Sequence, residues 1–203
     1  MPVTATCLIG DMTTNLASRS DYRVGTWTLD PAHSELSFWV RHLKISKVRG
    51  TFETFEVTVI TPEDPSQISV EASIDVSSVN TGVEPRDNHL RSSDFFLVEE
   101  HPHMLFRSTR IQVDGDDFTM DGELTLRGVT QPVTLTGEFG GVITDDYGRT
   151  KAGASATTTI NRQDFGVSWN AALEAGGFTL GDEVTISVDL QVQLQQSEAS
   201  AAA

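Results

Sequence analysis

Apolar and polar residues alternate along most of the chain between residues 24 and 195. The clearest run covers residues 183–195, in which Val184, Ile186 and Val188 fall on one side of an extended chain and polar residues on the other. The same alternation recurs at residues 36–41, 52–60, 70–76, 105–113, 118–126 and 133–139. Alternation of apolar and polar residues with a period of two exposes one face of a strand to solvent and is typical of antiparallel sheets. Strands of parallel sheets are apolar on both faces. The pattern predicts an all-β antiparallel protein.

Turn-forming residues separate the strands, and only two stretches favour a helix or an irregular segment. Residues 84–93 (EPRDNHLRSS) are polar, and residues 169–178 (WNAALEAGGF) begin with helix-favouring residues and stop at two glycines. Roughly eight strands are compatible with a two-sheet sandwich or with a closed barrel. Long strands and short connections favour the barrel, whose interior is wide enough for one small ligand. We therefore expect an extended up-and-down β-barrel of about eight strands with one or two short helices.

One predicted strand carries three successive alanines on one face, with no large side chain among them. Ala152, Ala154 and Ala156 share this face within residues 151–160 (KAGASATTTI). They leave space inside the barrel unless large neighbours such as Phe139 or Trp169 fill it. Residues 24–195 are predicted to form this single barrel domain, and the leader 1–23 and the tail 196–203 are predicted to be disordered.

Charge and composition narrow the possible partners. The 203 residues contain 14 Lys and Arg against 29 Asp and Glu, a net charge of −15, which disfavours nucleic acid and anionic membrane surfaces as partners. The single cysteine, Cys7, cannot form a disulfide within the chain. No segment reaches the ~20 apolar residues of a membrane span, and the leader lacks the basic start and apolar stretch of a secretory signal. These features predict a cytoplasmic protein without a membrane span.

Four blocks of sequence occur in a recognisable order. They are residues 27–52, with WTLDPAHSELSF, VRH and GTF; residues 86–96 (RDNHLRSSDFF); residues 124–133 (LTLRGVTQPV); and residues 160–166 (INRQDFG). Together they resemble the bacterial YceI-like, polyisoprenoid-binding family over about residues 27–194. The resemblance implies an extended lipocalin-like barrel whose apolar interior holds or transports a long isoprenoid chain, such as a polyprenyl phosphate or a quinone tail. It is also compatible with a homodimer. Many relatives are exported with a signal peptide, whereas this sequence is not expected to carry one.

We expect the ligand to be held mainly by apolar side chains that point into the barrel. The predicted inward residues are Phe38, Val40, Phe106, Phe118, Leu126, Ala154, Phe165, Trp169 and Phe178. Burial of the chain is the driving force, so that no specific hydrogen bond to the ligand is needed. The family resemblance adds His33, His42 and His89 as matched positions.

A polar segment precedes Phe95 and Phe96, which are themselves candidate ligand contacts. It contains Arg86, His89, Arg91 and Asp94, which are spaced too closely for all of them to face solvent. At least one basic residue should therefore turn toward the two phenylalanines and the barrel mouth. These polar residues either contact the ligand or form an internal salt-bridge cluster that closes one end of the barrel.

The histidines supply an alternative function. His101 and His103 alternate along the chain and are metal-ligand candidates together with His33, His42 or His89. No HExxH or cysteine pattern supports such a site, so a metal- or histidine-dependent stress-response enzyme ranks second. A GxSxG elbow and a glycine-rich phosphate loop are both missing, and we predict no catalytic residue, no metal and no cofactor besides the lipid. A third hypothesis is a filled structural barrel that acts through a protein partner.

Overall fold

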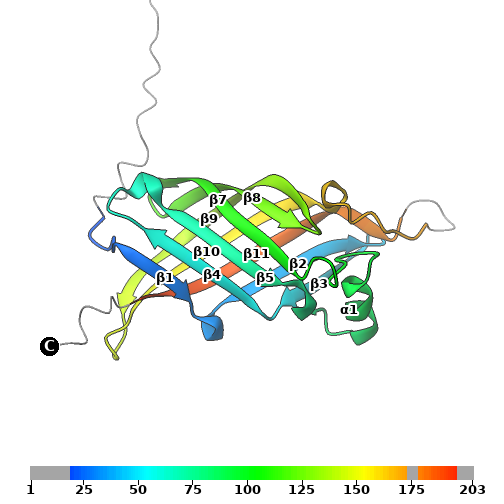
Figure 1. Ribbon diagram of the computed structural model, residues 1–203, viewed down its shortest axis with the longest axis horizontal. Coiled ribbons are helices and arrows are strands. Elements are labelled where there is room, and N and C mark those ends of the chain that lie inside the picture. The colour runs from blue at the N-terminus through cyan, green and yellow to red at the C-terminus, as the bar shows by residue number, and fades with distance from the viewer. Residues whose placement is uncertain (1–18, 173–177, 196–203) are drawn as a thin grey trace, which may run out of the picture.

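The strands form one barrel in the computed structural model, which describes residues 19–172 and 178–195 (Figure 1). The strands in these residues are β1 (Gly25–Leu29), β2 (Glu35–His42), β3 (Ser46–Phe52), β4 (Phe55–Thr61), β5 (Ser69–Asp75), β6 (Val79–Asn80), β7 (His103–Asp114), β8 (Asp117–Leu126), β9 (Val129–Thr144), β10 (Thr150–Asn161) and β11 (Leu180–Leu194). The helix α1 covers Glu84–Arg91. The 3-10 turns within the described ranges cover Pro31–His33 (η2), Pro65–Gln67 (η3), Val76–Ser78 (η4) and Arg162–Phe165 (η5).

Closure of the barrel depends on the length of β11. The order β1-β4-β5-β7-β8-β9-β10-β11 returns to β1, because residues 192–194 of β11 pair with β1. Residues 180–189 of the same strand pair with β2, so that β2 and β3 continue the wall beyond the end of β1. The barrel pairs are antiparallel. The predicted lipocalin-like, antiparallel barrel of about eight strands is confirmed.

The register of β10 decides which of its side chains enter the barrel. Ala154 lies opposite Leu190 of β11 and Phe139 of β9. Ala152 and Ala156 share its side of the strand, and all three alanines line an internal cavity. A slip of one residue would turn this face outward. The alanine face therefore points inward, as the alternation predicted.

The best-packed part of the interior lies at the end of the barrel that carries α1. Phe165, Val76 and Val79 are less than 2% exposed, and they come from η5, η4 and β6 rather than from the long strands. The side chains of Asp75 and Asn161 accept backbone hydrogen bonds at the start of η4 and η5 and so fix these turns. These short capped turns thus add the most deeply buried residues to a core that strands such as β2, β5 and β8 also supply.

The segment after η5 was predicted to be helical or irregular, and its described part is irregular. Residues 169–172 are not helical, and Ala172 instead forms an isolated β-bridge with Phe178. The cause is Asn170, whose side chain donates to the carbonyl of Leu180 and accepts from its N–H group, which ties the segment to β11. Residues 173–177 lie outside the described residues. The short helix predicted within residues 84–93 is confirmed as α1.

The start of the described chain lies at the end of the barrel opposite α1 (Figure 1). Residues 19–23, part of the predicted leader, contact the barrel there, and Arg19 forms an ion pair with Asp116 in the β7–β8 turn. The predictions for residues 1–18 and 196–203 lie outside the described residues. Across residues 19–172 and 178–195 we find no helix with the length and apolar character of a membrane span.

Candidate ligand-binding interior

The half of the barrel opposite α1 encloses a cavity of about 290 Å³, which we call the strap cavity. Its wall consists mainly of apolar side chains from the barrel strands. Among the predicted residues, Phe106, Phe118 and Ala154 line it, together with Ala152 and Ala156. Because alanine side chains reach only a short way into the barrel, this side of the wall leaves room for an apolar ligand.

Residues 19–23, which we call the strap, form one wall at the end of this cavity. The guanidinium of Arg19 donates hydrogen bonds to the carboxylates of Asp21 and Asp116. The hydroxyl of Tyr22 donates to the backbone carbonyl that follows β4, at 2.6 Å. The hydrogen bond from Arg19 lowers the pKa of Asp21, so that this carboxylate is charged at neutral pH. Polar contacts on two neighbouring connections thus hold the strap on the barrel.

A second cavity of about 360 Å³ lies at the α1 end, and we call it the helix cavity. Met104 and Ile186 line both cavities, so the two spaces adjoin inside one barrel. The predicted residues that line the helix cavity are Phe38, Val40, His42, Arg86, His89, Phe95, Phe96, Leu126 and Trp169. Aromatic and basic side chains therefore mix in its wall, whereas the charged residues of the strap cavity all belong to the strap.

His89 connects α1 to the wall of the helix cavity. Its imidazole meets the rings of Phe95 and Trp169 edge-on, with ring centres 5.0 and 4.8 Å away. Its Nε2 atom lies 2.8 Å from the carboxylate of Asp94. The prediction that one basic residue of this segment turns toward the phenylalanines is confirmed by His89.

The two arginines of α1 have different surroundings. Arg91 donates to the backbone carbonyls of Ser77 and Val79, which anchors the helix, and it lines neither cavity. Arg86 donates to the carbonyl and hydroxyl of Thr81 and also lines the helix cavity. The predicted salt-bridge cluster is thus reduced, within the described residues, to the single pair of His89 and Asp94, and Arg91 has a structural role.

Phenylalanine rings inside the barrel lie over glycines of the neighbouring strand. Phe38 pairs with Gly50 across β2 and β3, and Phe118 pairs with Gly137 across β8 and β9. A Cβ atom at Gly50 would lie 2.6 Å from the Phe38 ring, and one at Gly137 would lie 2.5 Å from the Phe118 ring. The missing side chains let each ring lie along the wall instead of filling the lumen. This pairing of a phenylalanine ring with a glycine was not predicted from the sequence, although a glycine within a strand pattern indicates it.

Arg162 is a buried cation that sequence reasoning also missed. The residue is 4% exposed, and its guanidinium donates to three backbone carbonyls, those of Val167, Trp169 and Gly181. It also pairs with the carboxylate of Asp182 at 3.1 Å. Because Arg162 and Trp169 both line the helix cavity, this arginine holds the segment after η5 against the ligand space. Only its place in the INRQDFG block marked it in the sequence.

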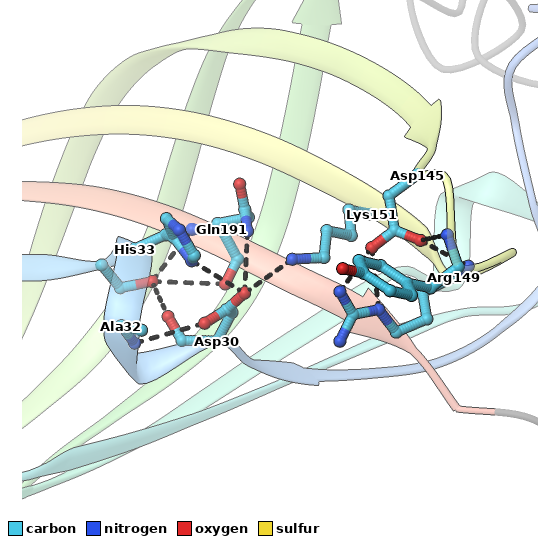
Figure 2. Close-up of polar contacts among 9 residues, drawn as sticks. Asp30, Ala32, His33, Asp145, Arg149, Lys151 and Gln191 are labelled. Carbon is cyan, nitrogen blue, oxygen red and sulfur yellow. Dashed lines mark hydrogen bonds and ion pairs between the residues drawn. The ribbon is translucent and has the colours of Figure 1, made fainter.

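Figure 2 shows a polar network around Asp30, beside η2. Its Oδ2 atom accepts hydrogen bonds from Lys151 at 2.9 Å and Gln191 at 2.8 Å, and lies 3.1 Å from Nδ1 of His33. The hydrogen bond from Lys151, with smaller contributions from Gln191 and His33, holds the pKa of Asp30 well below its usual range. Lys151 is 9% exposed, so Asp30 supplies the countercharge that its buried ammonium requires. The network ties η2 to β10 and β11.

Five predicted ligand contacts line neither cavity, namely Arg91, Asp94, Phe178, Phe165 and His33. Phe178 is 60% exposed, and the prediction that it points inward is wrong, because Asn170 and the bridge to Ala172 set the path of this segment. Phe165 points inward but is part of the packed core rather than of a cavity wall. His33 is exposed and is held by Asp30.

The histidines named as metal-ligand candidates are not gathered in one place. His42 and His89 line the helix cavity, whereas His33 belongs to η2 and His103 begins β7. Within residues 19–172 and 178–195, we find no group of three or more His, Cys, Asp or Glu side chains placed to hold a metal ion. Cys7 lies outside these residues.

The fold and the interior together define a class of protein, the antiparallel barrel with an apolar ligand space. A model of the YceI-like domain matches residues 27–192, and the chain belongs to this family. Among curated proteins, UPF0312 protein SA2479 of Staphylococcus aureus strain N315 is 37% identical over 172 residues, which cover 84% of this chain and 98% of that protein.

Solved structures share the fold. The YCEI protein of Campylobacter jejuni superposes with a TM-score of 0.66 at 29% identity, covering 77% of this chain and 90% of that one. BcnA of Burkholderia cenocepacia gives a TM-score of 0.68 at 24% identity, covering 80% and 98%. A polyisoprenoid binding domain from Saccharophagus degradans gives 0.58 at 17% identity, covering 83% and 98%. The barrel is therefore the common architecture of these proteins.

Proposed function

We propose that the barrel binds the long apolar chain of an amphiphilic lipid, such as a polyisoprenoid or the tail of a quinone, and sequesters or carries it. The observation that carries this proposal is a pair of largely apolar cavities that adjoin along one barrel. The strap and helix cavities adjoin at Met104 and Ile186, and their walls are largely apolar. An elongated apolar space suits a flexible chain better than a compact polar metabolite.

The energetics of such binding need no polar recognition. Each buried CH₂ group contributes about 0.8 kcal/mol, so ten carbons supply about 8 kcal/mol before the cost of association. That amount is compatible with micromolar affinity. The inward face of Ala152, Ala154 and Ala156 provides the space, and the rings of Phe38 and Phe118 lie along the wall because Gly50 and Gly137 admit them.

Relatives support the class of ligand. The Saccharophagus degradans domain is described as polyisoprenoid binding, and it shares the barrel fold with this chain. A binding role is also the simpler interpretation because Arg86, His89 and Arg162, three of the basic residues that line the helix cavity, are engaged by protein partners. We therefore propose a binding protein rather than an enzyme.

The other hypotheses make different predictions. A filled structural barrel is disfavoured, because the interior holds two cavities. A metal- or histidine-dependent enzyme predicts a stoichiometric transition metal that is lost in the His33→Ala or His42→Ala variant, and elemental analysis of the purified protein measures this directly. A homodimer and a cytoplasmic location stay predictions, which sedimentation and cell fractionation test.

Native mass spectrometry of the protein, purified without added ligand, tests the proposed function. We expect a population whose mass exceeds that of the chain by that of a lipid, and organic extraction should release the same lipid. Titration with fluorescent prenyl and fatty acyl chains should then give saturable binding at about micromolar concentration. Repeated recovery of protein without lipid, together with no binding of either probe, would overturn the proposal.

A further inference from the structure

The β2–β3 hairpin carries a local excess of positive charge in an acidic protein. Residues 41–49 (RHLKISKVR) contain four of the 14 Lys and Arg residues and no Asp or Glu. These four, Arg41, Lys44, Lys47 and Arg49, are all exposed. The net charge of −15 does not reveal this basic region, because the net charge is a sum over the whole chain.

The four cations differ from the other basic residues in their lack of partners. Within the described part of the chain, their side chains form no ion pair and donate no hydrogen bond, whereas nine of the other ten Lys and Arg residues do. Asp182 lies near Arg41 in the fold, since Gly181 packs against the Arg41 backbone, but its carboxylate accepts from Arg162 and Gln163. The charge of the hairpin is thus available to a partner.

The arrangement of these residues is unfavourable for the hairpin alone. Arg41 lies directly opposite Lys47 in the β2–β3 pair, and like charges in such a pair are destabilising. The Lys47 ammonium lies 3.3 Å from the centre of the Trp39 ring, on the outer face of the barrel. Lys44 adopts a positive φ of 61° in the turn. The Trp39 ring, which the Arg41 guanidinium also approaches at 5.9 Å, offsets part of the repulsion between Arg41 and Lys47 but neutralises neither charge. Like charges that the fold pairs but does not neutralise indicate a requirement outside it.

Apolar side chains accompany the charge. Ile45, at the tip of the hairpin, is 81% exposed, and Phe178 on the adjoining segment is 60% exposed. The backbone N–H of Leu43 donates to the carbonyl of Thr179 at 2.7 Å, which fixes the two segments side by side. Exposed aliphatic and aromatic residues within a basic surface are the composition of proteins that rest in the interface of a lipid bilayer.

We propose that the β2–β3 hairpin docks on an anionic lipid bilayer, with Arg41, Lys44, Lys47 and Arg49 against the phosphates and Ile45 among the lipid chains. At physiological ionic strength the screening length is about 8 Å, so the nearby cations outweigh carboxylates elsewhere on the barrel. The exposed Ile45 favours a bilayer over a nucleic acid, which offers no apolar layer for it.

Docking would bring the ligand space to the membrane. His42 and Val48 belong to the hairpin and line the helix cavity, so this cavity would face the bilayer surface. The proposal that the hairpin docks on a bilayer rests on the charges and exposed residues of the hairpin itself. Only the passage of a lipid between bilayer and barrel rests on the proposed function.

Vesicle flotation at physiological ionic strength tests the docking surface. We expect the protein to float with vesicles of phosphatidylcholine mixed with phosphatidylglycerol and to stay behind with pure phosphatidylcholine. The Arg41→Gln/Lys44→Gln variant should partition about thirtyfold less, at about 1 kcal/mol per cation near the surface. The Arg107→Gln/Arg110→Gln variant changes the net charge equally, on exposed positions of β7, and should float like the unmodified protein.

The remaining outcomes either support or overturn the proposal. A reduced partition of Ile45→Ser, with an unchanged thermal melt, supports insertion of the hairpin tip. Equal binding to neutral vesicles, equal loss in the β7 variant, or preferential binding to a DNA duplex or an acidic polypeptide would overturn it. The fluorescent chain titration, repeated on each variant, separates the two proposals: a protein that docks but binds no chain contradicts only the proposed function, and one that binds a chain but does not dock contradicts only the docking surface.

Discussion

The two cavities share one barrel but are built differently. The helix cavity borders the core in which Phe165, Val76 and Val79 are almost fully buried, whereas Ala154 and Phe118 remain partly exposed to the strap cavity that they line. Core packing is concentrated at the helix end, and polar contacts such as the Asp30 network support the strap end. The difference teaches that each end of the barrel combines a cavity with its own means of support, a packed core at the helix end and polar contacts at the strap end. Substitutions at the two ends should therefore have different consequences.

The largest expected effect lies in the packed end. Phe165→Ala should lower the free energy of unfolding by about 3–5 kcal/mol, because the ring is 1% exposed and its removal leaves a cavity among core residues. Phe178→Ala is the matched control and should cost less than about 0.5 kcal/mol, because this ring is exposed. Urea denaturation measures both values. Equal losses in the two variants would contradict the location of the core.

The Asp30 network is the corresponding test at the strap end. Asp30→Asn should lower the free energy of unfolding by about 2 kcal/mol at neutral pH, because the buried ammonium of Lys151 loses its countercharge. Since the folded protein lowers the pKa of Asp30, the stabilisation is complete above the ordinary aspartate pKa of about 3.9 and is lost as the pH falls through the lower folded value.

Urea denaturation at a series of pH values measures this difference. The gap between the unmodified protein and Asp30→Asn should be constant from neutral pH down to about 5 and shrink below about 4. Asp114→Asn, at an exposed position, is the control and should leave stability unchanged throughout. A gap that stays constant into acid would show that the charge of Asp30 contributes nothing.

A smaller effect is expected at the wall of the helix cavity. Gly50→Ala should lower the free energy of unfolding by about 1 kcal/mol, because the new methyl group displaces the Phe38 ring into the lumen. The maximum length of prenyl chain that the protein binds should decrease. Gly140→Ala is the control, because a Cβ there has its nearest neighbour at 3.4 Å. An unchanged chain-length limit in Gly50→Ala would refute the role of the ring and glycine pair.

The smallest effect on stability is expected for a substitution in the wall of the strap cavity. Ala154→Phe should change the free energy of unfolding by less than about 1 kcal/mol, because the cavity has room for the ring, and should abolish binding of the fluorescent chains. Thr159→Phe, on the outer face of the same strand and away from both cavities, should bind them normally. A marked drop in the melting temperature of lipid-free Ala154→Phe would instead indicate a tightly packed core around this residue.

The sequence predicted those features that follow from strand periodicity. Ala154 could be placed inside the barrel because a period of two leaves only one alternative. Phe178 was misplaced because it lies in a connection, where a side chain of Asn170 and not a period sets the path of the chain. Arg162 was missed because its burial, and its pairing with Asp182 on another element, depend on the fold.

The basic hairpin shows a different limit of sequence reasoning. The basic residues of the run 41–49 are visible in the sequence, but the net charge of the chain combines them with the acidic residues elsewhere. The meaning of this run depends on two facts that only the structure supplies: among the described residues its cations form no ion pair and donate no side-chain hydrogen bond, and Ile45 is exposed beside them. Local charge, placed on the fold, is therefore more informative about partners than the total.

The position of a bound chain tests the central claim most directly. We would determine a crystal structure of the protein with an alkyl or prenyl chain that carries bromine at its end, and locate the bromine by its anomalous scattering. The account predicts a bromine site inside the barrel, in the strap cavity near Ala154 and Leu190, with the chain extending toward Met104. A bromine site on the outer surface, or an interior that stays empty in protein shown to bind the chain, would contradict it.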